Sequence, residues 1–234
     1  MLTLIKKIFR QTGLLPLFYH KLNKILPSYE SLNPANLKVL KKAFKEAPNG
    51  DYYEFGVYKG FSFWFAMQIV DILNIKNTHF YGFDSFDGLP IPKGIDKEKI
   101  LNGTSFARGN FTASKNFVNN FLIKYGAKKE NYDLIEGFYD ESLNKNLLKK
   151  YKFKKASIIL VDCDLYESTK TVLTFATKLI QNNTIIVFDD WGITNKNKGE
   201  KLAFKEWSES NPKLSFEDFF SYKDVKSFKI KLKS

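Results

Sequence analysis

The sequence is poor in the residues that enzymes most often use for nucleophilic catalysis and covalent cross-linking. Its 234 residues include two histidines and a single cysteine, Cys163. One cysteine excludes an intramolecular disulfide and is typical of a protein from a reducing cytoplasm. Because Cys163 stands between two aspartates, its thiolate is disfavoured, and we interpret it as a small packing residue rather than a nucleophile.

Long apolar runs are also lacking. No stretch is long and apolar enough to span a bilayer, so the sequence predicts no membrane span. The first ten residues lack the uninterrupted apolar segment and the small-residue cleavage site of a signal peptide. Together with the cysteine content, these features predict a cytoplasmic protein, and the length fits one large α/β domain.

Arginine is almost absent, although the chain is basic. The formal net charge is +12, yet Arg10 and Arg108 are the only arginines, and lysines are spread along the whole sequence. Proteins that recognise nucleic acids usually cluster their basic residues and use arginine for bidentate contacts. The scattered lysines therefore argue against a nucleic-acid-binding domain, which we keep as an alternative. A basic surface would still attract an anionic substrate.

Two apolar runs in the second half of the chain end abruptly at acidic residues. Residues 158–161 precede Asp162 and Asp164, and residues 185–188 precede Asp189 and Asp190. Such short runs are typical of interior strands of a parallel sheet, and the segment between them has helical spacing. A right-handed crossover brings the acidic ends to one edge of the sheet, where open α/β sheets bind ligands.

Four carboxylates at one strand edge repel each other unless a cation lies between them or the side chains point apart. The alternative is that they cap the following helices, since aspartate is a common N-cap. Capping explains one aspartate at each strand end better than it explains two. We therefore favour a metal site at this edge.

Two earlier strands end at residues that suit a nucleoside ligand. Residues 51–60 form a strand and a turn containing Glu54, Gly56 and Gly60, where glycines would let the backbone approach a ligand. The spacing is not that of a dinucleotide-binding fingerprint. The next strand, residues 79–83, ends in Asp84, which is placed to bind ribose hydroxyls. The irregular stretch that follows, residues 91–108, is long enough to be a lid over the site.

The two ends of the chain differ from the middle. Residues 1–49 are predicted to be a helical extension, with a helix start at Asn33-Pro34, and residues 50–234 the main domain. The extension either caps the active site or mediates dimerisation, which would make the protein a homo-oligomer, or it packs against the domain; the sequence leaves these open. At the other end, alternating apolar and lysine residues from 228 to 233 predict a terminal antiparallel strand.

Six motifs occur in an order that resembles a known family. They are residues 54–60, 84–90, 109–114, 136–143, 162–169 and 189–192. Together they are similar to the macrocin O-methyltransferase family, whose members methylate sugar hydroxyls with S-adenosylmethionine. The resemblance extends from about residue 51 to residue 207. The strings DSFDGLP (84–90) and DCDLYEST (162–169) are its most specific parts.

The resemblance implies a fold and a set of site residues. The fold is the Rossmann-like α/β fold of class I methyltransferases, a mostly parallel seven-stranded sheet with an antiparallel edge strand. The implied cofactor-binding residues are Glu54, Gly56, Val57, Gly60, Asp84, Ser85, Glu136, Gly137, Phe138 and Asp162. The implied Mg²⁺ ligands are Asp162, Asp189 and Asp190, with Asp164 as the general base.

These inferences lead to a primary hypothesis and two alternatives. The first is a Mg²⁺-dependent O-methyltransferase of a sugar or sugar-containing small molecule, with S-adenosylmethionine as cofactor and neither nucleic acid nor a membrane as partner. The second keeps the reaction but replaces the sugar with a catechol-like or other vicinal diol. The third is the nucleic-acid-binding domain.

Overall fold

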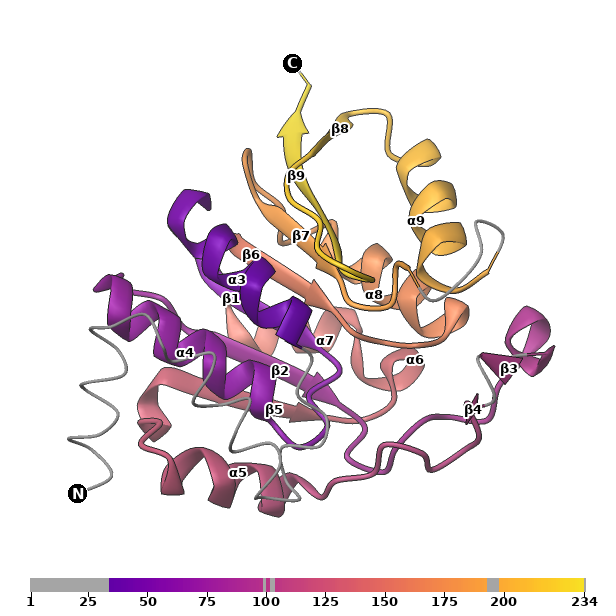
Figure 1. Cartoon of the computed structure of the whole chain (residues 1–234), viewed down its shortest axis with the longest axis horizontal. Coiled ribbons are helices and arrows are strands. Elements are labelled where there is room, and N and C mark those ends of the chain that lie inside the picture. Colours follow the sequence, from indigo (N-terminus) through magenta and orange to yellow (C-terminus); the bar gives the residue numbers. More distant parts are fainter. Residues whose placement is uncertain (1–33, 99, 102–103, 193–197, 234) are drawn as a thin grey trace.

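The structure, a computed structural model, describes residues 34–98, 100–101, 104–192 and 198–233. A seven-stranded sheet forms its centre, with the strand order β5-β2-β1-β6-β7-β9-β8 (Figure 1). The strands of this sheet are β1 Asp51–Phe55, β2 Phe80–Asp84, β5 Tyr132–Glu136, β6 Ala156–Val161, β7 Ile185–Phe188, β8 Leu214–Asp218 and β9 Lys226–Leu232.

The direction of the strands confirms the predicted fold class. Strands β5, β2, β1, β6 and β7 run parallel. The terminal strand β9 pairs antiparallel with β7, and β8 completes that edge by pairing antiparallel with β9. Strand order proceeds outward from β1 through β2 and β5 on one side and from β6 through β7 on the other. The topological switch point, where such sheets bind ligands, therefore lies between β1 and β6.

Helices cover both faces of the sheet (Figure 1). One face carries α3 Pro34–Glu46, α4 Phe61–Leu73 and α5 Lys115–Lys124. The other carries α6 Tyr139–Ser142, α7 Lys145–Tyr151, α8 Tyr166–Ala176 and α9 Gly199–Glu209. A short 3₁₀ turn, η3 Lys129–Asn131, precedes β5. None of the described helices has both the length and the apolarity that crossing a membrane requires.

Burial on both faces explains the continuous apolar strands. All five residues of β1 are buried, with Tyr52 in the core under α3 and α4, and with Tyr53 and Phe55 in the core under α8. The Phe55 ring stacks on Phe83 of the neighbouring strand at a centroid distance of 4.5 Å. Large aromatic pairs of this kind contribute both buried area and a defined geometry. Asp51 and Glu54 are the buried acidic residues of this strand.

The N-terminal prediction is tested only in part. Residues 1–33 of the predicted helical extension lie outside the described residues. Helix α3 begins at Pro34, as the sequence indicates. Its buried Leu37, Leu40 and Phe44 share one core with α4 and the sheet. This helix therefore packs against the domain, whereas the boundary at residue 49 and a capping or dimerisation role stay predictions.

Two other parts of the chain differ from the expectation. Strand β8 was not predicted, because its five residues show neither an apolar run nor a complete alternation. The stretch after Pro90, expected to be irregular, contains the 3₁₀ turn η2 Gly94–Glu98 and the short hairpin of β3 Ile100–Leu101 with β4 Thr104–Ser105. Its two ends are joined, since Leu89 donates its N–H to Asn110 O and accepts from Gly109 N.

Gly56 occupies the switch point, where only glycine fits. Its φ of +95° lies in the region that favours glycine. A Cβ at this residue would lie 1.7 Å from the carbonyl oxygen of Asp162, a backbone atom held by the sheet. The turn after β1 therefore packs directly against the backbone at the end of β6.

Gly56→Ala should destabilise the fold strongly. We expect a loss of about 2–5 kcal/mol in the free energy of unfolding, from left-handed backbone strain together with overpacking. Gly126→Ala is the matched control, because Gly126 has a φ of +87° but nothing within 4 Å of its added Cβ. The control should lose about 1–2 kcal/mol. Equal losses in urea denaturation would show that the contact with Asp162 does not constrain the turn.

Candidate active site

A row of backbone hydrogen bonds aligns the turns that follow the parallel strands. Beyond the strands themselves, Gly137 N donates to Asp84 O at 3.0 Å and Gly56 N to Phe83 O at 2.9 Å. On the other side of the switch point, Asp162 N donates to Phe55 O at 2.8 Å and Asp189 N to Val161 O at 3.1 Å. These bonds place five turns side by side along the carboxyl edge of the sheet.

A cavity of about 600 Å³ lies along this row. Many of the site residues indicated by the sequence line it together: Gly56, Asp84, Ser85, Gly137, Phe138, Asp162, Asp164, Asp189 and Asp190. Glu54, Val57, Gly60 and Glu136 are not part of its lining. The volume lies within the range of about 300–1,000 Å³ that is usual for small-molecule sites.

Asp84 joins the turn after β1 to the turn after β2. Its Oδ2 accepts the N–H groups of Val57 and Tyr58, each at 2.8 Å, and its Oδ1 accepts the N–H of Phe86 at 2.7 Å. Burial raises the pKa of the Asp84 carboxyl, and the three N–H donors oppose that rise. A carboxylate has about four lone-pair sites, so capacity for a ligand hydroxyl remains after these bonds.

Three of the predicted cofactor residues outside the lining act within the protein. Val57 donates its N–H to Asp84 and so fixes the carboxylate in place. Gly60 packs against Val118 and Phe121 of α5, since a Cβ there would lie 2.9 Å from Val118. Glu136 is exposed and lies 3.6 Å from the Lys115 ammonium. Direct contacts of these residues with a cofactor stay predictions.

Glu54, the fourth, is a fully buried carboxyl on the central strand. It accepts hydrogen bonds from the Tyr52 hydroxyl at 2.5 Å and from the Ser62 hydroxyl at 2.6 Å. Burial raises the pKa of Glu54 to about 8, although both hydroxyls lower it. At neutral pH this side chain is therefore mostly protonated, and it links β1 to the first turn of α4.

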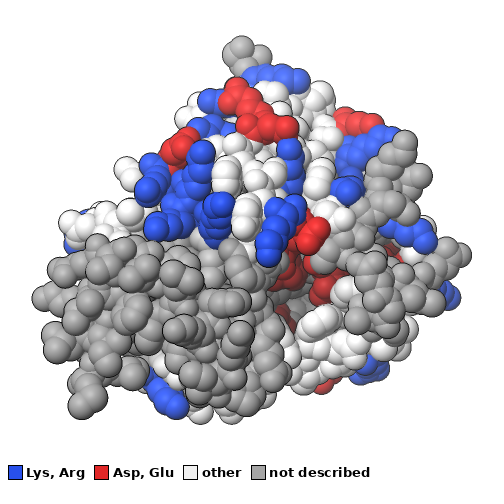
Figure 2. Space-filling model, in the orientation of Figure 1, with Lys and Arg blue, Asp and Glu red and all other residues white. Residues whose placement is uncertain are grey.

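The carboxylates after β6 and β7 form one electrostatic group. Burial, followed by the charges of Asp189, Asp190 and Asp164, raises the pKa of Asp162 well above its usual range. In the face of the molecule that Figure 2 shows, acidic side chains gather in a hollow, and lysines lie on the surface above it. A basic protein thus contains an acidic cavity, a setting that favours a bound cation.

The oxygen atoms of these carboxylates can be compared with the ligands that Mg²⁺ prefers. The side chains of this group offer only hard carboxylate oxygens, which are such ligands. Across the described residues, however, no three His, Cys, Asp or Glu side chains are arranged to hold a metal ion. The chemistry of the donors fits the ion, and the set of ligands stays a prediction.

Asp164 adopts an unusual backbone conformation. Its φ is +60°, in the left-handed region that aspartate and asparagine tolerate better than other non-glycine residues. Leu165 follows with its N–H donated to Cys163 O at 2.5 Å, which turns the chain into α8. The sharp turn presents Asp164 to the cavity two residues before the helix begins. Strained residues of this kind concentrate at functional sites.

Glu200, in the first turn of α9, is a site residue that sequence analysis missed. It is fully buried, and its Oε2 accepts the N–H of Asp190 at 3.0 Å. Its Oε1 has no hydrogen-bond partner within the part of the chain that the structure describes. Burial and the charges of Asp190, Asp189 and Asp164 raise its pKa well above the usual range. No sequence signal marks it, because its position depends on how α9 packs.

Two residues have the structural roles that the sequence indicates. Cys163 is buried, its Sγ donates to Phe55 O at 3.5 Å, and burial raises the pKa of its thiol. Cys163 also lines the cavity, and its burial and raised thiol pKa are consistent with the predicted packing role. His79 lies 2.9 Å from Asp133 at the opposite end of β2 from Asp84 and does not line the cavity.

An aromatic group lines the cavity near its mouth. Phe111 lies 5.7 Å from the Tyr58 ring and 6.0 Å from the Phe106 ring, between ring centroids. Phe111 is 47% exposed and has a φ of +61°. The 109–114 motif therefore delivers an exposed aromatic ring to the site, next to the turn after β1.

The sheet topology and the placement of the cavity define a class I methyltransferase fold. The sequence pattern of the Macrocin-O-methyltransferase (TylF) family matches residues 34–216. This match spans most of the chain, and the protein belongs to that family. The match begins with α3, earlier than the motifs alone suggest.

Individual proteins that match this chain have low sequence identity to it. A mycinamicin III 3''-O-methyltransferase from Micromonospora griseorubida is 24% identical over 158 residues, which is 66% of this chain and 60% of that relative. The O-methyltransferase NovP has a similar structure, with a TM-score of 0.71, 18% identity, and coverage of 84% of this chain and 80% of its own.

Calicheamicin methyltransferase CalS11 also has a similar structure, with a TM-score of 0.65, 19% identity, and coverage of 93% and 83%. A second structure describes it as a TDP-rhamnose 3'-O-methyltransferase. At these identities, the two structural likenesses establish the fold.

The raised pKa of Glu54 predicts a pH dependence of stability. Between the ordinary glutamate pKa of about 4.5 and the folded pKa of about 8, the unfolded chain loses this proton while the folded chain keeps it. Raising the pH through this window therefore lowers the free energy of unfolding. Glu54→Gln stays neutral and lacks this contribution.

We expect the stability of Glu54→Gln relative to wild type to increase by about 1 kcal/mol per pH unit across this window. Urea denaturation of both proteins from pH 5 to pH 8 measures it. Taking the difference cancels the titration of the other buried carboxyls. A difference that stays constant with pH would show that Glu54 is ionised in the folded protein.

Proposed function

We propose that this protein is an S-adenosylmethionine-dependent O-methyltransferase that uses Mg²⁺ to methylate a hydroxyl of a sugar or sugar-containing small molecule. One observation carries the proposal: a single cavity joins the glycine turn and Asp84 to the carboxylates that follow β6 and β7. Family membership supports methyl transfer. The names of the mycinamicin relative and of CalS11 support a glycoside or nucleotide-sugar acceptor.

The cofactor is assigned to the side of the cavity formed by the turns after β1, β2 and β5. Gly56 lines this side of the cavity, so a ligand there can approach its backbone. Asp84 has acceptor capacity left for ribose hydroxyls, with Ser85 beside it, and Gly137 and Phe138 line the region assigned to adenine. The acidic cavity also suits the positive charge of a sulfonium.

The acceptor is assigned to the side near α8 and the carboxylates. Asp164 accepts the proton of the acceptor hydroxyl while the oxygen bonds to the methyl group and the sulfonium–methyl bond breaks. Walls that hold the oxygen in line with methyl and sulfur contribute much of the rate. Asp162, Asp189 and Asp190 would hold Mg²⁺, which would lower the pKa of a hydroxyl that it coordinates. Glu200 holds the turn that contains Asp189 and Asp190 through its bond to Asp190 N.

The acidic cavity also bears on the alternatives. The site is a cavity of about 600 Å³, a size that suits a small molecule, and the lysines are scattered along the chain, so a small-molecule acceptor is favoured over nucleic acid. A catechol or other vicinal diol would use the same carboxylates. A panel of nucleotide-sugars, glycosides and catechols, assayed with the same donor and Mg²⁺, separates these acceptors.

Asp84→Ala should weaken the donor. Each charge-assisted hydrogen bond to ribose contributes on the order of 1.5–3 kcal/mol, so the dissociation constant of S-adenosylmethionine should rise by at least about tenfold. Isothermal titration calorimetry measures it. Asp87→Ala removes an exposed carboxylate from the same motif and should leave the affinity unchanged. Unchanged affinity in Asp84→Ala would remove Asp84 from the donor site.

Asp164→Asn should separate the base from the metal ligands. Asparagine tolerates the left-handed backbone at this position, so the variant tests proton transfer rather than folding. We expect kcat to fall by about 10²–10⁴-fold, equivalent to roughly 3–5 kcal/mol, with Mg²⁺ binding retained. Steady-state kinetics at increasing Mg²⁺ measures this, and the loss should persist at saturating metal.

Asp189→Asn is the comparison variant. It should bind Mg²⁺ more weakly and regain part of its activity as Mg²⁺ is raised. If added Mg²⁺ restores Asp164→Asn instead, Asp164 is a ligand and not the base. If EDTA leaves the wild-type enzyme fully active, the metal assignment is wrong and the carboxylates need another explanation.

A further inference from the structure

Helix α8 begins directly beyond Asp164 and lacks a cap of its own. Its N-cap residue is Leu165, whose side chain can accept no hydrogen bond. The first N–H groups of any helix need partners, and a carboxylate also interacts favourably with the positive end of the helix dipole. The partner for α8 must therefore come from elsewhere in the chain.

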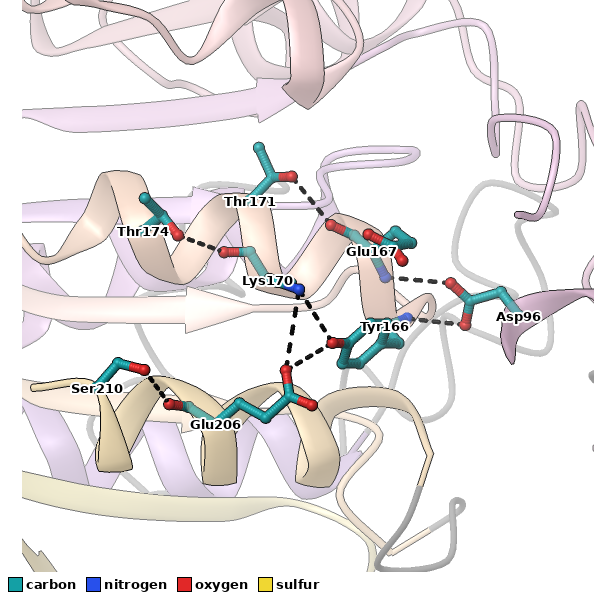
Figure 3. Close-up of polar contacts among 8 residues, drawn as sticks. All are labelled: Asp96, Tyr166, Glu167, Lys170, Thr171, Thr174, Glu206 and Ser210. Carbon is teal, nitrogen blue, oxygen red and sulfur yellow. Dashed lines mark hydrogen bonds and ion pairs between the residues drawn. The ribbon is translucent and has the colours of Figure 1, made fainter. Parts of the chain in front are cut away.

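Asp96 supplies the missing cap from 70 residues upstream (Figure 3). Its Oδ1 accepts the N–H of Tyr166 at 2.9 Å, and its Oδ2 accepts the N–H of Glu167 at 3.1 Å. The side chain is 2% exposed. A buried carboxylate thus binds the first helical turn with both of its oxygens.

Asp96 belongs to residues 90–98, which we call the wall segment. Pro90, Ile91, Lys93 and Asp96 of this segment line the cavity. At its N-terminal end, the segment is held where Leu89 forms backbone hydrogen bonds to Gly109 and Asn110. Asp96 holds it at the other end. The wall segment therefore spans the cavity between two attachments.

Helix α8 is the fixed partner in this contact. On its outer side the Tyr166 hydroxyl donates to Glu206 of α9 at 2.6 Å, and the Lys170 ammonium donates to the Tyr166 hydroxyl at 3.2 Å (Figure 3). On its inner side Glu167, Ser168 and Thr171 line the cavity. The cap by Asp96 thus joins two walls of one site, and one of those walls is anchored to the rest of the domain.

We propose that Asp96 is a positioning residue for the acceptor: by capping α8 it holds the wall segment in place beside Asp164 and so shapes the acceptor side of the cavity. This inference rests on the proposed methyl transfer. It separates acceptor binding from donor binding, because Asp96 is bonded to α8, which follows β6, whereas the turns assigned to the donor follow β1, β2 and β5. A cap that only stabilised α8 would not affect the acceptor selectively.

The test compares Asp96→Ala with Asn144→Ala. Asn144 caps α7 with two N–H bonds, from Asn146 at 2.9 Å and Leu147 at 3.1 Å, and does not line the cavity. Each variant therefore loses a two-bond helix cap, but only one loss involves the wall segment. Asp96→Asn keeps one carbonyl oxygen as an acceptor and should recover part of the function.

Kinetics with the best acceptor of the panel give the first readout. We expect kcat/KM for the acceptor to fall by about tenfold in Asp96→Ala, the scale of one lost helix cap, mainly through a higher acceptor KM. Asp96→Asn should give a smaller loss. The donor dissociation constant should stay within about twofold of wild type, and Asn144→Ala should match wild type in both quantities.

Hydrogen exchange gives the second readout and needs no activity. In Asp96→Ala, the amides of Ile91, of residues 93–98 and of Tyr166 and Glu167 should exchange faster, while those of β6 stay protected and show that the fold is intact. Unchanged exchange would overturn the proposed attachment. Faster exchange with an unchanged acceptor kcat/KM would reduce Asp96 to a structural cap and overturn the positioning role. A wild-type protein inactive on every acceptor would instead reject the proposed function.

Discussion

The site depends on the backbone hydrogen bonds that continue beyond the strand ends of a parallel sheet. Four such bonds fix the turns that contain Gly137, Asp84, Gly56, Asp162 and Asp189 in one row. Side chains take no part in these bonds, so the spacing of the row follows from the strand register alone. Parallel strands occur in sheets that are covered on both faces, which explains why so many large aromatic residues are buried in two cores.

The same arrangement concentrates negative charge where the protein can least solvate it. Burial, together with the charges of Asp189 and Asp190, raises the pKa of both Asp162 and Glu200 at this edge of the sheet. Such groups are costly to bury without a counter-charge. The free energy that stabilises them must come from the cores on either side of the sheet. In one of these cores Phe188, Trp191 and Phe228, which flank the second acidic pair or its strand, pack against one another.

The sequence predicts this row well because its signals are local. The strand and glycine turn within residues 51–60, the strand at residues 79–83 and the acidic strand ends are all visible within a few residues. Glu200 and Asp96 were not found, because each acts on a partner that only the tertiary structure brings near. Asp96 lies in a stretch that looks irregular in sequence, and its partner is a helix start 70 residues away. Strand β8 was missed for a related reason, since an edge strand needs little apolar pattern of its own.

Backbone register holds one part of the cavity in place, and contacts made by side chains hold the other part. On the side proposed for the cofactor, the parts are set by backbone register and by Asp84, which bonds to three backbone N–H groups. On the side proposed for the acceptor, the walls come from the wall segment, which is attached to α8 through one buried aspartate, and from α8, which is itself fixed to α9. Loops held by a few side-chain contacts can change without altering the sheet beneath them, and rigid strand ends cannot. A fold built in this way can keep one methyl donor while the wall segment is remodelled for a different acceptor.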